Sequence, residues 1–202
     1  MRITQQAKEE TRTRIIACAE QLFRTQGFDA TRTKEIAQEA GIAAGTLFNY
    51  FPTKEAVAVA LMESALQAAE KTFRKQVIES ASLEEDLFAF IAIGLRKLRP
   101  YRAYAKAVIE TCLSPAATDE ASAGASNIRT RHLEIFGEFA TARGYSEPPT
   151  AMECQLYWTL YIGVLSFWAS DSSTSQEDTL ALLDQSLQMF VSWFNQQRST
   201  DS

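Results

Sequence analysis

The segment KEIAQEAGIAAGTLFNYF, residues 34–51, combines residue types and spacings that can place side chains against DNA. Its apolar residues recur where two short helices would pack together, at Ile36, Ala40, Ile42, Leu47 and either Tyr50 or Phe51. Ala37 is small where the second helix must cross, and Gly41 lies in the turn, where a left-handed backbone is favoured. We interpret the segment as a helix-turn-helix, with a generic helical hairpin as the alternative.

The second helix of such a motif lies in the major groove of DNA. Leu47 and Phe51 are four residues apart and point inward, so the opposite side of the helix faces the groove. Small residues there permit close approach, Asn49 can pair with an adenine edge, and hydroxyl and lysine groups can reach phosphates, with Lys54 as a phosphate clamp. The predicted DNA-binding residues are Thr33, Lys34, Ala44, Gly45, Thr46, Phe48, Asn49, Tyr50 and Lys54. For each residue, the alternative is a solvated surface group.

Helical periodicity dominates the rest of the chain, which has few Gly (8) and Pro (5) residues and no strand-like pattern. We therefore expect an all-α fold of about nine helices. The expected positions are near residues 8–26, 33–40, 44–50, 53–79, 127–143, 150–170 and 176–197, with two more helices opening at Ser82 and Pro100. By composition, residues 114–126 are expected to form a loop.

The charge is divided unevenly along the chain. Residues 1–54 carry 8 basic and 6 acidic side chains, net +2, whereas residues 55–202 carry 12 and 19, net −7. A nucleic-acid role therefore belongs to the first part. We predict a helix-turn-helix DNA-binding domain over residues 1–54 and a larger helical bundle for ligand binding and dimerisation over residues 55–202.

Several other classes of function find no support in the sequence. Three cysteines without metal-ligand spacing argue against a disulfide framework or a metal site, and we interpret them as small buried side chains rather than redox sensors. No cofactor fingerprint or catalytic arrangement is present, and His132 is interpreted as a surface or helix-packing residue rather than a ligand contact or pH sensor. The longest apolar run, residues 156–169, is shorter than the roughly 18–20 residues that span a bilayer. We expect a cytoplasmic protein that is not an enzyme and has no cofactor and no membrane contact.

The last two expected helices suggest self-association. Residues 156–169 are apolar nearly all round, and a helix without a polar face must be covered on every side. The final helix has two apolar stripes, one for the core and one for a two-fold mate, so we predict a four-helix dimer interface. Its predicted residues are Trp158, Leu165, Trp168, Leu182, Met189 and Trp193. The alternative is that both stripes fit one broad core.

Aromatic residues gather in the second part of the chain and can form the walls of a pocket for a small, largely apolar or aromatic molecule. The predicted ligand-binding residues are Phe88, Tyr101, Tyr104, Phe136, Phe139, Tyr157 and Tyr161. Ordinary core packing is the alternative for each of them.

Residues 8–62 resemble the N-terminal domain of TetR-type transcriptional regulators, and the phrase AGIAAGTLFNYFPTKE is especially similar. The resemblance implies a homodimeric repressor that binds a palindromic operator in double-stranded DNA and is released by a small-molecule effector. A helical module of the same fold that senses ligands or proteins without operator binding is the alternative. Two positions depart from the family pattern. Ala43 replaces the usual Ser or Thr cap of the second helix, and Phe48 replaces a Tyr whose hydroxyl meets a phosphate.

Overall fold

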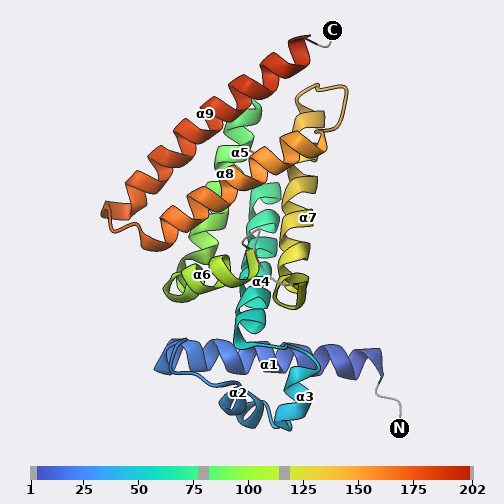
Figure 1. Ribbon diagram of the computed structural model, residues 1–202, viewed down its shortest axis with the longest axis vertical. Helices are drawn as coiled ribbons and strands as arrows, with labels where there is room; N and C mark the ends of the chain where they lie inside the picture. Colours follow the sequence, from blue (N-terminus) through green and yellow to red (C-terminus); the bar gives the residue numbers. More distant parts are fainter. Residues whose placement is uncertain (1–3, 77–81, 114–118, 201–202) are drawn as a thin grey trace. The chain divides into compact units, whose positions relative to one another are not determined.

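The computed structural model describes residues 4–76, 82–113 and 119–200, and its regular elements are all helical (Figure 1). They are α1 (Gln5–Gln26), α2 (Thr33–Glu39), α3 (Ala44–Phe48), α4 (Lys54–Lys75), α5 (Leu83–Leu98), α6 (Arg102–Val108), α7 (Asp119–Ala142), α8 (Ala151–Ser170) and α9 (Glu177–Thr200). Short 3₁₀ turns cover Arg99–Tyr101 and Thr174–Gln176, and a π-helical turn covers Ile109–Leu113. The predicted all-α class is confirmed.

The chain divides into two compact units. The first unit takes residues up to Ser64 together with Ala103–Ala125, and the second takes Ala65–Arg102 and the residues from Ser126 onward. Helix α4 contributes residues to both units. The division of function between residues 1–54 and 55–202 stays a prediction. None of the described helices is long and apolar enough to cross a membrane.

Local signals fix several helix ends. Helix α1 stops at Gly27, whose φ of +90° is easily reached only by glycine. The Thr53 hydroxyl accepts a hydrogen bond of 3.1 Å from the Ala56 N–H and caps α4. At α8, the Thr150 hydroxyl and the Glu153 carboxylate form a reciprocal capping box. These ends lie close to the positions that the sequence predicts.

One predicted loop is wrong in part. Residues 114–118 lie outside the described residues, but α7 begins at Asp119, so residues 119–126 are helical rather than a loop. Alanine occupies positions 121, 123 and 125. Because alanine is the best helix former, these residues outweigh the serines and the glycine that suggested a loop. The helix expected over residues 53–79 corresponds to α4, which ends at Lys75. Residues 77–81 lie outside the described residues.

Ion pairs join the helices of the second unit. The Arg131 guanidinium of α7 donates to both carboxylate oxygens of Glu70 on α4, at 2.5 and 3.1 Å. Arg74 Nε donates to the same carboxylate at 2.8 Å. The hydrogen bonds from Arg131 lower the pKa of Glu70 to about 2. Arg143 likewise donates to both oxygens of Asp86, at 2.6 and 2.9 Å, which ties α7 to α5.

The Glu70 carboxylate should make stability depend on pH. Because its pKa is lowered from 4.5 to about 2, the stabilisation is complete above pH 4.5 and is lost as the pH falls towards 2. We expect Glu70→Gln to lower the free energy of unfolding by about 1 kcal/mol at neutral pH, since the arginines are partly exposed. This difference from the wild type should shrink during acid titration, measured by chemical denaturation at each pH. Glu134→Gln, at a more exposed partner of Arg131, is the control. A Glu70→Gln difference that stays constant down to pH 2 would contradict the assignment.

Candidate nucleic-acid interface

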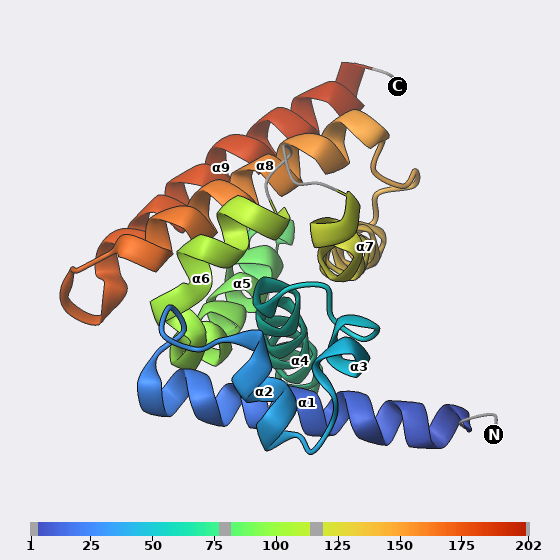
Figure 2. The same cartoon turned by 60° about the horizontal axis from the view of Figure 1, so that its bottom comes forward.

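Helices α2 and α3 form the predicted helix-turn-helix and lie beside α1 in the first unit (Figure 2). Helices α2 and α3 pack against each other, and Ile36, Ala37 and Leu47 on them are at most 2% exposed. Gly41 has a φ of +66° in the turn, and the next residue, Ile42, donates its N–H to the Ala37 carbonyl at 3.0 Å. Of the two residues left open by the sequence, it is Phe51 rather than Tyr50 that is buried in this core.

The start of α2 is fixed to the end of α1 by side-chain hydrogen bonds. The buried Thr31 hydroxyl donates to the Gly27 carbonyl at 2.7 Å. Gln26 Nε2 donates to Glu35 Oε2 at 3.0 Å, and the same oxygen accepts the Arg32 N–H at 2.9 Å. The Glu35 carboxylate thus caps α2 from within its first turn and links it to α1.

Lys54 makes a contact that the sequence does not suggest. Its ammonium nitrogen lies 2.8 Å from the Phe28 carbonyl oxygen, 3.3 Å from that of Asp29 and 3.4 Å from that of Thr31. It also lies 4.4 Å from the centre of the Phe28 ring. A lysine has three donors, and here they face three carbonyls within the protein. Lys54 thus connects the start of α4 to the loop between α1 and α2. The phosphate contact of Lys54 stays a prediction.

The outward side of α3 carries no charged side chain. Gly45, Phe48 and Asn49 are exposed, while Ala44, Thr46 and Tyr50 are half-buried. The helix has five residues and begins after Ala43, which supplies no side-chain cap. Its position therefore depends on the burial of Leu47, its one buried residue, rather than on its own end groups.

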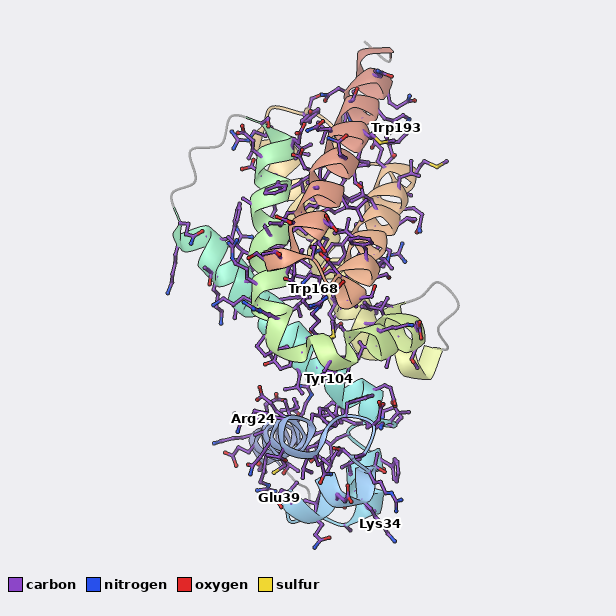
Figure 3. The ribbon with its side chains drawn as sticks, turned by 90° about the vertical axis from the view of Figure 1, so that its left-hand side faces the viewer. Arg24, Lys34, Glu39, Tyr104, Trp168 and Trp193 are labelled. Atoms are coloured by element: carbon purple, nitrogen blue, oxygen red, sulfur yellow. The ribbon has the colours of Figure 1, made fainter. Side chains whose placement is uncertain are left out.

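Part of the predicted set surrounds a surface cavity of about 700 Å³. The lining residues are Asp29, Thr31, Arg32, Thr33, Lys34, Ala44, Phe48, Pro52, Thr53, Lys54 and Glu55. Thr33, Lys34, Ala44, Phe48 and Lys54 are thus brought together from α2, α3 and α4, and Figure 3 shows the exposed Lys34 at the edge of this unit. Gly45, Thr46, Asn49 and Tyr50 do not line this cavity but lie on the same short segment.

The predicted ligand-binding aromatics do not all come together. Phe136, Phe139, Tyr157 and Tyr161 are buried in the second unit, where Phe136 stacks on Tyr157 with ring centres 4.5 Å apart. Tyr104 packs in the first unit, stacked on Phe28 at 5.0 Å. The remaining two, Phe88 and Tyr101, are half-buried. Mutual packing thus accounts for the five buried rings, and a role in ligand binding stays a prediction.

His132 lies among the aromatic residues of the second unit. Its Nε2 is 2.9 Å from the Tyr157 hydroxyl, and its ring stacks on Tyr161 with centres 4.0 Å apart. Burial lowers the pKa of His132 to about 3, so the imidazole is neutral at physiological pH. This environment agrees with the packing role that the sequence favours over a ligand contact.

Half of the predicted dimer residues are buried within the chain itself. Trp158, Leu165 and Trp168 are at most 5% exposed and lie on the side of α8 that faces the second unit's core. That side of the helix is not available to a partner. Leu182 and Met189 on α9 are exposed, at 37% and 75%.

The opposite side of α8 also carries large apolar side chains, which are not among the predicted interface residues. Met152, Leu156 and Phe167 are exposed there, at 67%, 43% and 42%. With α9 they form one apolar surface, which we call the α8–α9 face. It contains a groove of about 420 Å³ lined by Leu156, Leu160, Ser186, Met189, Phe190 and Trp193, the last labelled in Figure 3. The four-residue spacing along α8 was visible in the sequence, but it did not stand out because the whole helix is apolar.

The three thiols are free, and burial raises their pKa values, that of Cys112 to about 11. They are therefore protonated at neutral pH and weakly nucleophilic. Within the described part of the chain, no group of three or more His, Cys, Asp or Glu side chains is placed to hold a metal ion.

Lys54 should act on stability. We expect Lys54→Met to lower the free energy of unfolding by about 1–3 kcal/mol, because two part-buried carbonyls, of Phe28 and Thr31, lose a charged donor. Lys34→Met, at an exposed lysine with no such contacts, should change it by less than about 0.5 kcal/mol. Thermal and urea denaturation of the two variants provide the comparison. Equal effects of the two substitutions would contradict the role given to Lys54.

Comparisons with known proteins cover both parts of the chain. The family profile described as "Bacterial regulatory proteins, tetR family" matches residues 15–61, and that of the "Tetracyclin repressor-like, C-terminal domain" matches residues 86–201. The HTH-type transcriptional regulator RutR of Escherichia coli is 33% identical over 90 residues, which are 43% of this chain and 41% of RutR. The regulator UidR of the same species is 33% identical over 69 residues, 34% of this chain and 35% of UidR. The chain thus aligns with about two fifths or less of the length of these relatives.

Solved structures share the fold across most of the chain. FadR of Thermus thermophilus, a TetR-family repressor solved with lauroyl-CoA, has a TM-score of 0.69 at 22% identity, covering 89% of this chain and 93% of FadR. A TetR transcriptional regulator from Rhodococcus sp. RHA1 has a TM-score of 0.70 at 21% identity, covering 91% and 97% of the two chains. At these identities, the likeness establishes the fold alone.

Proposed function

The chain belongs to the TetR family of bacterial transcriptional regulators, and we propose that it is a homodimeric repressor that binds a palindromic operator and leaves it when a small molecule binds. The observation that carries the proposal is the outward side of α3. It is held in place by Leu47 and Phe51 and presents small or half-exposed side chains with no acidic group among residues 44–50.

Binding to DNA follows from what this surface offers. Ala44 and Gly45 leave room for the edges of bases, and the exposed Asn49 amide matches the donor and acceptor of adenine. Lys34 adds a positive charge at the edge of the cavity, while the ammonium of Lys54 is occupied. One motif therefore has few phosphate contacts, so useful affinity and sequence selectivity require two copies.

The second copy of the motif would come from a second chain that binds through the α8–α9 face. Its exposed side chains are large and apolar and come from two adjacent helices, and two such pairs can close into a four-helix bundle around a two-fold axis. Covering α8 on this side also removes from water the apolar surface that the rest of the chain leaves open. The interface residues that we now propose are Met152, Leu156, Leu160, Phe167, Leu182, Met189 and Trp193.

Release by a small molecule needs a link between the ligand domain and the motif. Helix α4 is continuous and has residues in both units, so a displacement of its second half is transmitted along one rigid element. The aromatic composition of the second unit favours a largely apolar or aromatic effector. FadR of Thermus thermophilus, which shares this fold, was solved with the acyl ligand lauroyl-CoA.

The test of DNA binding is selection of sequences from random duplexes, followed by titration of the enriched duplex by fluorescence anisotropy. We expect an inverted repeat, bound about a hundredfold more weakly at about 200 mM than at about 50 mM salt because counterions are released. A folded dimer that enriches no sequence and binds no duplex at low salt would reject the proposal and favour a ligand- or protein-sensing module.

The α8–α9 face is tested by a charge at its centre. Met189→Glu should convert a dimer into a monomer at micromolar concentration, because an unpaired carboxylate would be buried between apolar side chains. Ala181→Glu places the same charge on an exposed position of α9 outside the face and should leave the dimer intact. Sedimentation velocity measures both. A Met189→Glu protein that remains a dimer would show that the chains associate elsewhere.

A further inference from the structure

Phe48 is an aromatic residue that the fold leaves half in water. Its side chain is 50% exposed, whereas the neighbouring Leu47 is fully buried. A single exposed apolar residue is common on protein surfaces and indicates nothing by itself. What makes Phe48 informative is its place on α3, the helix that carries the proposed DNA contacts.

The ring stands beside open space. Phe48 and Ala44, one turn apart on α3, line the cavity of about 700 Å³ together with Thr33 and Lys34 of α2. This part of the wall pairs apolar surface with a lysine and a threonine. The phenyl ring of Phe48 can pack on an apolar group at the edge of a base, such as a methyl group, while Lys34 and Thr33 can contact the DNA backbone.

The remaining chemistry of α3 limits which bases it can read. From Ala44 to Tyr50 the sequence is AGTLFNY, which contains no Arg, Lys, Gln, Glu, Asp or His. The bidentate contact to guanine needs an Arg or Lys, and the contact to cytosine needs a carboxylate. The groups of this segment that match a base are the Asn49 amide for adenine and, for the 5-methyl group of thymine, Ala44, the Thr46 methyl group and the Phe48 ring. Of the three apolar groups, Phe48 is the exposed one.

We infer that Phe48 reads thymine through its 5-methyl group and so directs α3 to A·T pairs in the operator; the inference rests on the proposed operator binding. A tyrosine at this position could donate its hydroxyl to a phosphate, but a phenyl ring has no donor. The contribution of Phe48 to binding must therefore come from apolar contact of its ring. Packing on sugar atoms is the competing placement, and it would be indifferent to the methyl group.

The experiment removes one methyl group at a time. In the duplex enriched by selection, each thymine of one half-site is replaced by deoxyuridine, and binding is measured by fluorescence anisotropy for the wild type and Phe48→Ala. At one thymine we expect removal of the methyl to weaken wild-type binding about fourfold, the effect of leaving one apolar carbon unburied. Phe48→Ala should bind thymine and deoxyuridine equally at that position.

Two further variants distinguish the contribution of the Phe48 ring to methyl recognition from a general loss of DNA affinity. Phe48→Tyr keeps the ring and should keep the sensitivity to the methyl group. Tyr50→Phe removes a hydroxyl that we place near a phosphate and should weaken binding to all duplexes alike while preserving the fourfold ratio. Circular dichroism and melting curves establish that each variant is folded, which is expected because Phe48 is half exposed.

The outcomes are distinct. Loss of the methyl effect in Phe48→Ala alone supports the inference. A wild type that binds its operator but is indifferent to every methyl group, or a Phe48→Ala protein that keeps the same ratio, overturns it while leaving operator binding intact. Failure of the folded wild type to bind any duplex overturns the proposed function and, with it, the inference.

Discussion

The burial of Leu47 and Phe51 is the constraint on which the DNA-facing surface depends. Helix α3 has five residues and no side-chain cap, so it is far too short to be stable alone. Its direction is set because Leu47 packs with Ile36 and Ala37, and Gly41 turns the chain with a positive φ. Glu35, Thr31 and Lys54 then fix α2 and the preceding loop. Outward residues are free to vary because inward residues do the positioning.

A second constraint acts in the larger unit, where two opposite sides of α8 carry large apolar side chains. One side carries Trp158 and Trp168 into the core, and the other leaves Leu156 and Phe167 in water. Such a helix is stable in water only when both sides are covered. The exposed apolar side chains therefore favour the proposed dimer, which would have twice the DNA contacts of one chain. In the proposed account, self-association and DNA reading are physically linked although different helices serve them.

What the sequence predicts well is local. The turn at Gly41, the burial of Leu47 and the helix starts near residues 53 and 150 depend on contacts within four or five residues, so spacing reveals them. The internal contacts of Lys54 could not be predicted, because the carbonyls that it meets lie 23 to 26 residues away, at Phe28, Asp29 and Thr31. The burial of Trp158, Leu165 and Trp168 inside the chain could not be predicted, because residues 156–169 have so few polar side chains that the sequence does not show which side of the helix faces the core. Residues 119–126 were read as a loop because alanine was given too little weight.

The central claim is that two copies of α3 enter neighbouring grooves on one face of DNA. Hydroxyl-radical footprinting of the wild-type dimer on its enriched duplex tests this most directly. The account predicts two protected patches related by two-fold symmetry, with centres about one helical turn or a small multiple of it apart. A single protected patch, or protection that does not follow the helical repeat, would contradict it.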